Sequence, residues 1–428
     1  MADEQSGGRD AAPRGGDAAS AAAPGKPADG GAWRWKSIRA ALSSTRFLLG
    51  SACVIVIALA ILLLSHFEVL PEEPEHWSAD QRTARLSARK AAQDPRIALV
   101  LVTDRTLSQF PYSAPVDRGL LADVIRHVSR AGPTAIGVDF IFDRPTEPAK
   151  DERLIAVLKD AAAPVIVGEI DEAGRLTAEQ LAYQRNFLAR TGRPRGHLFF
   201  EINRPRLVIS DQVIRFTLER PGQKSLPELL AEAGGHVERH QGRLWGAIFP
   251  VSDRIAWLRP PSNGSQTFLT LDAQSVIDLG ARNEPDMLKD MLGGRIVLVG
   301  VDVSDRDQHL TPLSVLTDTR FPGVFIQAQI VGQLLDGRAI HALSWGTELI
   351  ALLVVAGLGF YLGSRYRLWR EEFIVEIIGA AVLVALGFLT FAAASLIIPY
   401  TSLLLAWLAG TIAGHHRHWI AERLRLPG

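Results

Sequence analysis

The chain has 428 residues, 46 basic and 46 acidic side chains, and 47% hydrophobic residues. This length exceeds that of one ordinary domain, and the balanced charge argues against a nucleic acid or another polyanion as the partner. The only cysteine, Cys53, excludes an intramolecular disulfide, so the cellular compartment has to be inferred from membrane topology.

The N-terminal part of the chain predicts a tail followed by a membrane anchor. Residues 1–32 are dominated by Ala, Gly, Asp and Pro without a periodic apolar face, which predicts a disordered cytoplasmic tail. Residues 47–65 are uncharged, apolar and long enough to cross a bilayer as a helix. Because four basic residues precede this run and no small-residue cleavage pattern follows it, we expect an uncleaved anchor with its N-terminus in the cytoplasm. The basic residues are Arg34, Lys36, Arg39 and Arg46.

Three further apolar runs predict transmembrane helices at residues 347–363, 373–398 and 400–414, the last of marginal length. Arginines lie between the first two runs, and basic residues also occupy the final segment, residues 415–428. The positive-inside rule therefore predicts four crossings, with both termini in the cytoplasm of a bacterial cell and residues 66–343 in the periplasm.

The apolar runs themselves carry little that indicates transport. Glu376 lies near a predicted cytoplasmic end, and Glu348 is the second residue of its run, so a substrate path through the helices is not favoured. Gly359 and Gly363 have the GxxxG spacing that permits close helix packing. Packing within the same bundle is the favoured interpretation, and a dimer interface is the alternative.

The periplasmic segment has the pattern of an α/β domain. Nearly continuous aliphatic runs predict strands that are buried on both faces of a parallel sheet, and amphipathic stretches between them predict helices. We expect a mixed, mainly parallel sheet with an inserted β-rich lobe, together with the four transmembrane helices. The strands are predicted at residues 97–104, 134–143, 163–171 and 295–302, the helices at 76–94, 119–132, 151–162 and 324–337, and the lobe at 195–261.

Several carboxylates stand at the carboxyl ends of these predicted strands, where open parallel sheets bind their ligands. Asp104, Asp139, Asp143 and Asp302 are the main candidates for a common rim that binds a cation or a ligand amine. For any single residue, the alternative that it caps a helix or orders a loop is favoured.

Recognised catalytic motifs are missing from the sequence. We find no phosphate loop, no GxSxG elbow, no HExxH and no paired CxxC, so we expect neither an enzyme nor a bound cofactor or metal. His236 and His240 are spaced i, i+4 but are flanked by glycines, which favours a polar loop over a metal pair. The histidines beyond the last apolar run are interpreted as residues at the membrane edge.

An ordered series of short motifs gives the chain a family resemblance. Its positions are Asp104, Leu107, Phe110-Pro111, Arg118, Asp139 and Phe142, then Asp211 and Arg215, then residues 294–300, Asp307, Thr311-Pro312 and residues 321–324. In this order they resemble the type 2 CHASE (CHASE2) domain, an extracytoplasmic sensory module of bacterial signalling proteins. The resemblance covers the whole periplasmic segment, and membrane helices after the domain are the usual arrangement in that family. In two departures, Tyr112 follows Pro111 where Trp is usual, and Gln327 stands where His is frequent, either of which would alter a ligand contact.

The resemblance implies a membrane-anchored sensor or regulatory subunit in bacterial signal transduction. We expect no kinase or cyclase domain in this chain, so the signal would pass through the transmembrane helices to a separate membrane or cytoplasmic protein, or through self-association. An unidentified small molecule or other envelope cue would bind, with the lipid bilayer as the other partner. Alternatives are a metal-dependent envelope enzyme at the rim carboxylates and a structural anchor without a ligand. The candidate ligand-binding residues are Asp104, Arg118, Asp139, Asp143, Asp302 and Asp307.

Overall fold

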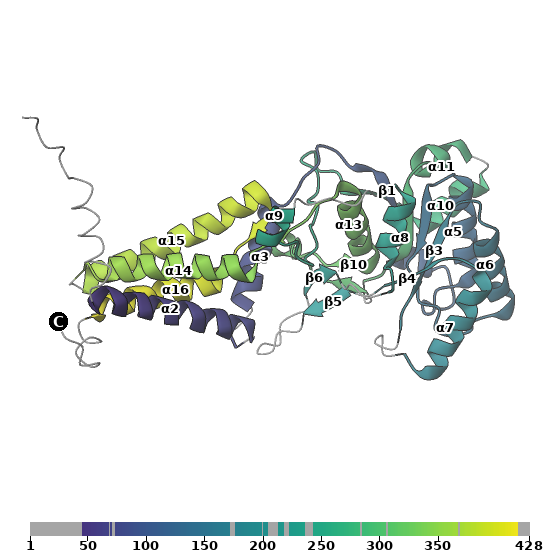
Figure 1. The fold of residues 1–428 in the computed structure, drawn as a ribbon. Coiled ribbons are helices and arrows are strands. Elements are labelled where there is room, and N and C mark those ends of the chain that lie inside the picture. Colours follow the sequence, from purple (N-terminus) through teal and green to yellow (C-terminus); the bar gives the residue numbers. More distant parts are fainter. Residues whose placement is uncertain are drawn as a thin grey trace, which may run out of the picture.

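The computed structural model describes residues 45–417 except 68, 71–72, 172–175, 199, 204–212, 218–221, 236–242, 283–284, 305–306 and 367–368. These residues form an α/β domain and an adjoining bundle of apolar helices (Figure 1). The predictions for residues 1–32, for Asp211, for the His236 and His240 pair and for most of the C-terminal tail lie outside the described residues.

The α/β domain is built on a six-stranded sheet with the strand order β4-β3-β2-β8-β1-β7. All the strand pairings described in it are parallel, and its central strands are apolar and almost completely buried. The fold-class prediction is confirmed for this domain, since strands covered on both faces consist of continuous aliphatic runs. The strands are β1 (Asp94–Thr103), β2 (Ala135–Val138), β3 (Val165–Glu169), β4 (Arg195–His197), β7 (Phe268–Asp272) and β8 (Ile296–Asp302).

Helices cover both faces of the sheet, as the apolar strands require. One face carries α5 (Arg118–Arg130), α6 (Pro148–Asp160), α7 (Ala178–Thr191), α10 (Ala273–Ala281) and α11 (Pro285–Leu292). The other face carries α8 (Leu226–Ala233) and α13 (Gly323–Asp336), which lie on the side toward the helical bundle (Figure 1). A short helix, α4 (Asp104–Leu107), follows β1, and another, α12 (Ser314–Thr317), lies before α13.

The β-rich lobe predicted for residues 195–261 is only partly present. An antiparallel hairpin of β5 (Phe200–Asn203) and β6 (Val213–Thr217) confirms one half of it. The prediction of strands in the second half is wrong at α9 (Arg243–Ile248), a short helix. There the rings of Trp245 and Phe249 lie 4.6 Å apart, which is the i, i+4 contact of a helical turn. A second small antiparallel pair, β9 (Gln308–His309) with β10 (Phe321–Pro322), precedes α13.

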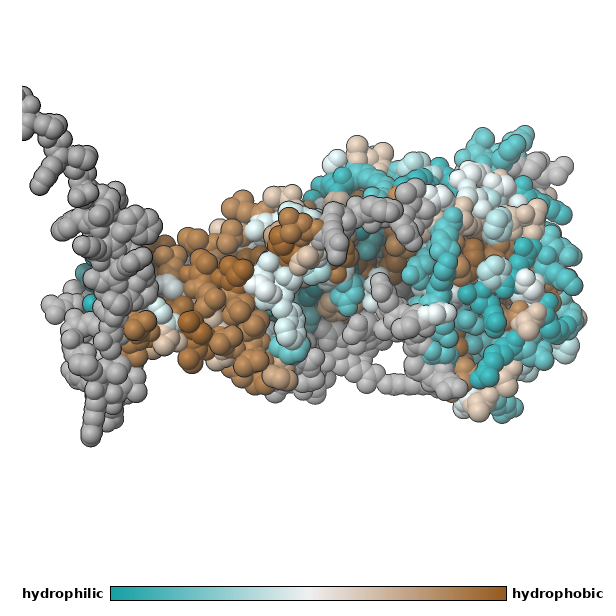
Figure 2. Space-filling model, in the orientation of Figure 1, coloured by the Kyte–Doolittle hydropathy of each residue, from teal (hydrophilic) through white to brown (hydrophobic). Residues whose placement is uncertain are grey.

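The apolar runs form the helices of the bundle, whose surface is hydrophobic where that of the α/β domain is mainly hydrophilic (Figure 2). Among the described residues, three helices are long and apolar enough to span a membrane: α2 (Thr45–His66), α14 (Trp345–Gly363) and α15 (Trp369–Ala394). The fourth, α16 (Tyr400–His415), has 16 residues. At 1.5 Å per residue it measures about 24 Å, less than the hydrocarbon core of about 30 Å. Three spans therefore meet the criterion, not the four predicted.

Glycines bring α14 and α16 into close contact. A Cβ atom on Gly363 would lie 2.1 Å from the carbonyl oxygen of Thr411, and one on Gly414 would lie 2.2 Å from that of Phe360. A Cβ atom on Gly410 would lie 2.4 Å from the carbonyl oxygen of Ala356, and one on Gly359 would lie 2.8 Å from that of Trp407. The GxxxG spacing of α14 thus serves packing within the bundle, which confirms the favoured interpretation.

Candidate ligand-binding site

A cavity of about 600 Å³ lies beyond the carboxyl ends of β2 and β8. It is the position where open parallel sheets place their ligands. Four of the six predicted site residues line it, namely Arg118, Asp139, Asp143 and Asp307. The apolar part of its wall includes Leu107, Val116, Phe140, Ile141, Leu198 and Val301.

Two predicted site residues do not line this cavity. Asp104 accepts hydrogen bonds from the backbone N–H and the hydroxyl of Ser304, at 3.1 and 2.6 Å. Asp302 accepts one from the side-chain amide of Gln308 at 2.9 Å. Both carboxylates therefore order the loop after β8, which is the alternative favoured for single rim residues.

Asp139 follows β2 directly, and its backbone N–H donates to the carbonyl of Val299 at 2.9 Å. Its side chain is half-buried in the cavity wall and makes no hydrogen bond within the described part of the chain. Burial, and then repulsion from Asp307, raises the pKa of Asp139 to about 8. The group is therefore mainly a neutral carboxylic acid at neutral pH, able to donate as well as accept a hydrogen bond.

Asp307 is held beside the start of α13. Its backbone has φ +52°, in the left-handed region, and its carboxylate accepts hydrogen bonds from Gly323 N–H at 3.1 Å and His309 Nε2 at 2.8 Å. A Cβ atom on Gly323 would lie 2.6 Å from a carboxylate oxygen of Asp307. Only glycine therefore permits this contact, which places a carboxylate at the positive end of the helix.

Arg118 begins α5 and is 1% exposed. In the described part of the chain its buried Nε and Nη2 atoms have no hydrogen-bond partner, and the carboxylate of Asp151 lies 3.7 Å from Nε. The guanidinium carbon stands 4.4 Å from the ring centre of Phe142, a cation–π contact, and burial lowers the pKa of Arg118. A buried cation with unused donors thus forms part of the cavity wall.

Two further polar residues of the cavity wall, Asp143 and Gln327, already have hydrogen-bond partners. Asp143 accepts from Arg144 at 2.9 Å and from Gln180 at 2.7 Å. Gln327, one of the two departures from the family pattern, also lines the cavity and donates to the carbonyl of Leu198 at 3.3 Å. The other departure, Tyr112, lies outside the lining and hydrogen-bonds Glu147.

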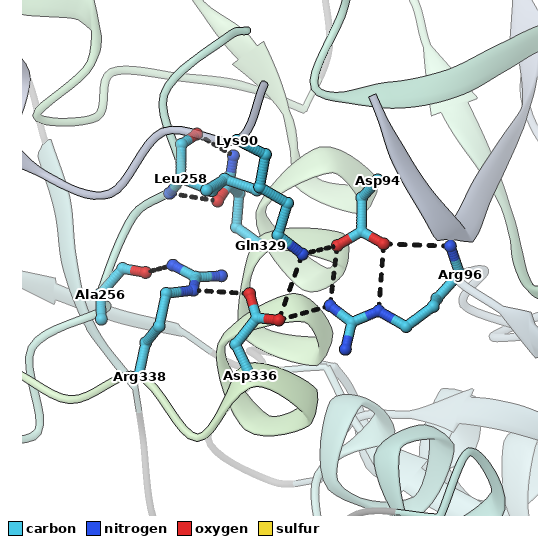
Figure 3. A network of polar contacts seen from close by, with 8 residues as sticks. All are labelled: Lys90, Asp94, Arg96, Ala256, Leu258, Gln329, Asp336 and Arg338. Carbon is cyan, nitrogen blue, oxygen red and sulfur yellow. Dashed lines mark hydrogen bonds and ion pairs between the residues drawn. The ribbon is translucent and has the colours of Figure 1, made fainter. Parts of the chain in front are cut away.

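Helix α13 connects this cavity with the start of the bundle. Gly323 and Gln327 lie at the cavity, and Asp336 at the other end of the helix belongs to a network of charges (Figure 3). In that network Arg96 and Lys90 each bridge Asp336 to Asp94, which is fully buried at the start of β1.

The middle of α13 is also fixed to the rest of the domain, because Gln329 makes two hydrogen bonds with the backbone of Leu258, at 2.8 and 3.0 Å (Figure 3). Eight residues separate the end of α13 from the start of α14. A displacement of α13 can therefore be transmitted to the apolar helix α14 through a short segment of the chain.

A second connection runs through α3 (Glu73–Leu86), which was not among the candidate site elements. Arg215 on β6 makes a two-armed ion pair with Asp80 of α3, at 2.8 to 3.0 Å, and Asp80 is 4% exposed. Glu75 of α3 accepts a hydrogen bond from the N–H of Thr401 at 3.1 Å and so caps the first turn of α16. Arg215 was quoted above for its family motif, but nothing in the sequence indicated its pairing with Asp80 or the contact between Glu75 and Thr401.

The family comparison agrees with this architecture. The model of the CHASE2 domain matches residues 54–361, from within α2 to within α14. The match covers more than half of the chain, so the protein belongs to the CHASE2 domain family, a family of extracellular sensory domains. No curated protein and no solved structure gives a significant match.

Proposed function

We propose that the protein is a membrane-anchored sensor or regulatory subunit of bacterial signal transduction, whose cavity at the carboxyl ends of β2 and β8 binds a small molecule. The observation that carries this proposal is Asp139, a carboxyl group without a hydrogen-bond partner in the described residues that faces a second carboxylate across a cavity. Groups of this kind destabilise a protein unless something compensates them, so they concentrate at functional sites.

Signal transmission follows from the position of α13. A ligand that contacts Gln327 touches α13 directly, and one that contacts Asp307 touches the residue that binds Gly323 at its first turn; the other end of α13 leads into α14. Binding shifts the arrangement of the membrane helices only if the ligand has a higher affinity for one arrangement than for the other. A difference of about 1–3 kcal/mol is typical of such coupling. The recipient is a separate membrane or cytoplasmic signalling protein, or a second copy of this chain.

The proposed topology has four crossings of the bacterial inner membrane, with α16 as the fourth. Its first turn is capped by Glu75, and its C-terminal half is packed against α14 through Gly410 and Gly414. A helix enclosed in this way does not need the full length of a lipid-exposed span, because protein groups satisfy its ends. Both termini are cytoplasmic and the α/β domain is periplasmic in this arrangement.

Neither alternative function has a supporting observation. Within the residues described, His, Cys, Asp and Glu side chains nowhere gather in groups of three or more that could hold a metal ion, so no observation there favours the alternative of a metal-dependent enzyme. A structural anchor without a ligand would not require an uncompensated carboxyl group in a cavity wall.

A screen for stabilising compounds tests the proposal. The full chain in detergent is heated with fractionated envelope metabolites, and an active fraction should raise Tm by about 3 °C or more when the ligand is well above its Kd. Asp139→Asn should abolish the shift. Asp104→Asn is the matched control, because Asp104 binds Ser304 away from the cavity lining, and it should keep the shift. If both variants lose the shift, or both retain it, the ligand does not bind in this cavity and the proposal is contradicted.

A further inference from the structure

A second cavity, of about 340 Å³, lies where α3 meets the membrane helices. Polar side chains from α3 form one side of it, including Ser78, Gln81, Arg82 and Arg85. The other side comes from the membrane helix α15 and includes Val384 and Phe388. The cavity therefore combines a cationic side with an apolar side that borders the hydrophobic surface of the bundle.

Arg82 is the buried polar group of this cavity, with 1% of its surface exposed. Its Nε and Nη2 atoms donate to the carbonyl and the hydroxyl of Ser78, both at 3.1 Å, and Glu75 lies 3.5 Å from Nη2. The Nη1 atom is buried and has no hydrogen-bond partner among the residues that the structure describes. A Cβ atom on Gly387 of α15 would stand 3.4 Å from Nη1, so the unused donor faces a place where α15 has no side chain. A buried guanidinium donor without an acceptor is costly, which indicates that an acceptor binds here.

The surroundings of Arg82 indicate the class of that acceptor. Arg85, which is exposed, adds a second positive charge, whereas among the described residues Glu75 is the only carboxylate paired with Arg82. Trp77, which is 65% exposed, and Tyr400 also line the cavity. Both residue types are typical of the membrane–water boundary. Val384, 38% exposed, continues the wall along the lipid-facing surface of α15. An anion with an attached apolar chain satisfies all of these features.

We propose that this cavity binds the phosphate group of a glycerophospholipid from the membrane leaflet next to the α/β domain. Arg82 and Arg85 contact the phosphate oxygens, which arginine recognises well, and an acyl chain lies along Val384 and Phe388. The lipid thereby joins α3 to α15. This proposal requires only that the helical bundle lies in a membrane. Its test is therefore independent of the proposed sensory role.

Thermal unfolding of the delipidated full chain in detergent tests the site. Dioleoyl phosphatidylglycerol is titrated in one arm, inorganic phosphate in the second, and dioleoylglycerol, which has the same chains without phosphate, in the third. A saturable rise in Tm is expected with phosphatidylglycerol alone. An equal rise with inorganic phosphate would show a free-anion site, and an equal rise with dioleoylglycerol would show an apolar site, and either result overturns the proposal.

Three variants localise the effect. Gly387→Leu fills the space in front of Nη1 and should abolish the lipid-dependent rise. Arg85→Gln removes the exposed charge and should weaken the apparent lipid affinity about tenfold, as expected for the loss of one charge-assisted hydrogen bond. Arg89→Gln removes an equally exposed charge just beyond α3 that does not line the cavity, and it should titrate like the natural protein. If Gly387→Leu does not fold, Arg85→Gln provides the test. An unchanged lipid affinity in Arg85→Gln would contradict the proposed lipid site.

Discussion

Asp139→Asn should make the protein more stable at pH 8.5 and reduce the dependence of its stability on pH. Burial and the nearby Asp307 raise the pKa of Asp139 to about 8 in the folded state, whereas an unfolded Asp has a pKa of about 3.9. Between these two values the folded state holds a proton that the unfolded state has released. The free energy of unfolding therefore falls as pH rises from about 4 to about 8, and then levels off.

The expected size of this effect is large for a single side chain. The full shift corresponds to an upper limit of about 5 kcal/mol, and because the cavity is open to solvent we expect roughly 2 kcal/mol in practice. Asparagine has no carboxylate to bury and avoids this penalty. At pH 8.5 its Tm should exceed that of the natural protein by about 5 °C, and at pH 5 the two should be much closer.

Thermal unfolding of both full-length proteins at several pH values measures this difference. The other charged groups around the cavity are present in both proteins, so the difference between the two curves isolates Asp139. Those groups are Arg118, Asp143, Arg144, Asp307 and His309. Parallel curves for the two proteins would mean that Asp139 is ionised at neutral pH, and the case for an uncompensated carboxyl group would be lost.

Asp80→Asn should destabilise the protein by about 3 kcal/mol, because removal of one partner of a buried ion pair leaves the other charge uncompensated. Arg215 makes a two-armed contact with Asp80, and its side chain is 13% exposed. We expect a fall in Tm of about 10 °C. The loss should be greatest for the attachment of α3 to the hairpin of β5 and β6, which hydrogen exchange resolves as faster exchange in α3.

An exposed ion pair provides the control for this prediction. Arg190 and Glu152 pair at the surface, with 46% and 60% of their side chains exposed. Glu152→Gln should therefore cost less than about 1 kcal/mol. The double variant Asp80→Asn with Arg215→Met removes both charges and should recover part of the lost stability. If Asp80→Asn costs no more than Glu152→Gln, α3 is not fastened to the domain through this pair.

The central strands could be predicted from the sequence, because strands buried on both faces consist of uninterrupted aliphatic residues. The two outer strands could not be assigned to this sheet: β7 was not predicted, and residues 195–197 of β4 were wrongly placed in the separate β-rich lobe. β7 has polar Thr270 among its leucines, and β4 consists of only three residues, Arg195–His197, without an apolar pattern. Both segments are strands because they form backbone hydrogen bonds with a neighbouring strand of the sheet. Pairing of this kind depends on the tertiary fold and leaves no pattern in the local sequence. The same limit explains α9, where an apolar run could not be assigned to helix or strand from its composition.

The candidate site was partly predictable for a related reason. Acidic residues after buried strands indicated the correct edge of the sheet, but not which of them face the cavity. Asp104 and Asp139 have the same local pattern, and only the fold brings Ser304, 200 positions away, to Asp104. Arg118 and Asp307 became candidates through the family resemblance alone. Asp80 was missed because its partner Arg215 lies 135 positions further along the chain.

The most direct test concerns the side of the membrane on which the α/β domain lies, since both the sensory role and the leaflet of the bound lipid depend on it. In a Cys53→Ser background, Asn263→Cys places a thiol on an exposed turn of the domain, and Arg365→Cys places one in the exposed segment after α14. In intact spheroplasts, a membrane-impermeant maleimide should label Asn263→Cys at once and Arg365→Cys only after lysis. Labelling of Arg365→Cys in intact spheroplasts with protection of Asn263→Cys would place the domain in the cytoplasm and contradict the account.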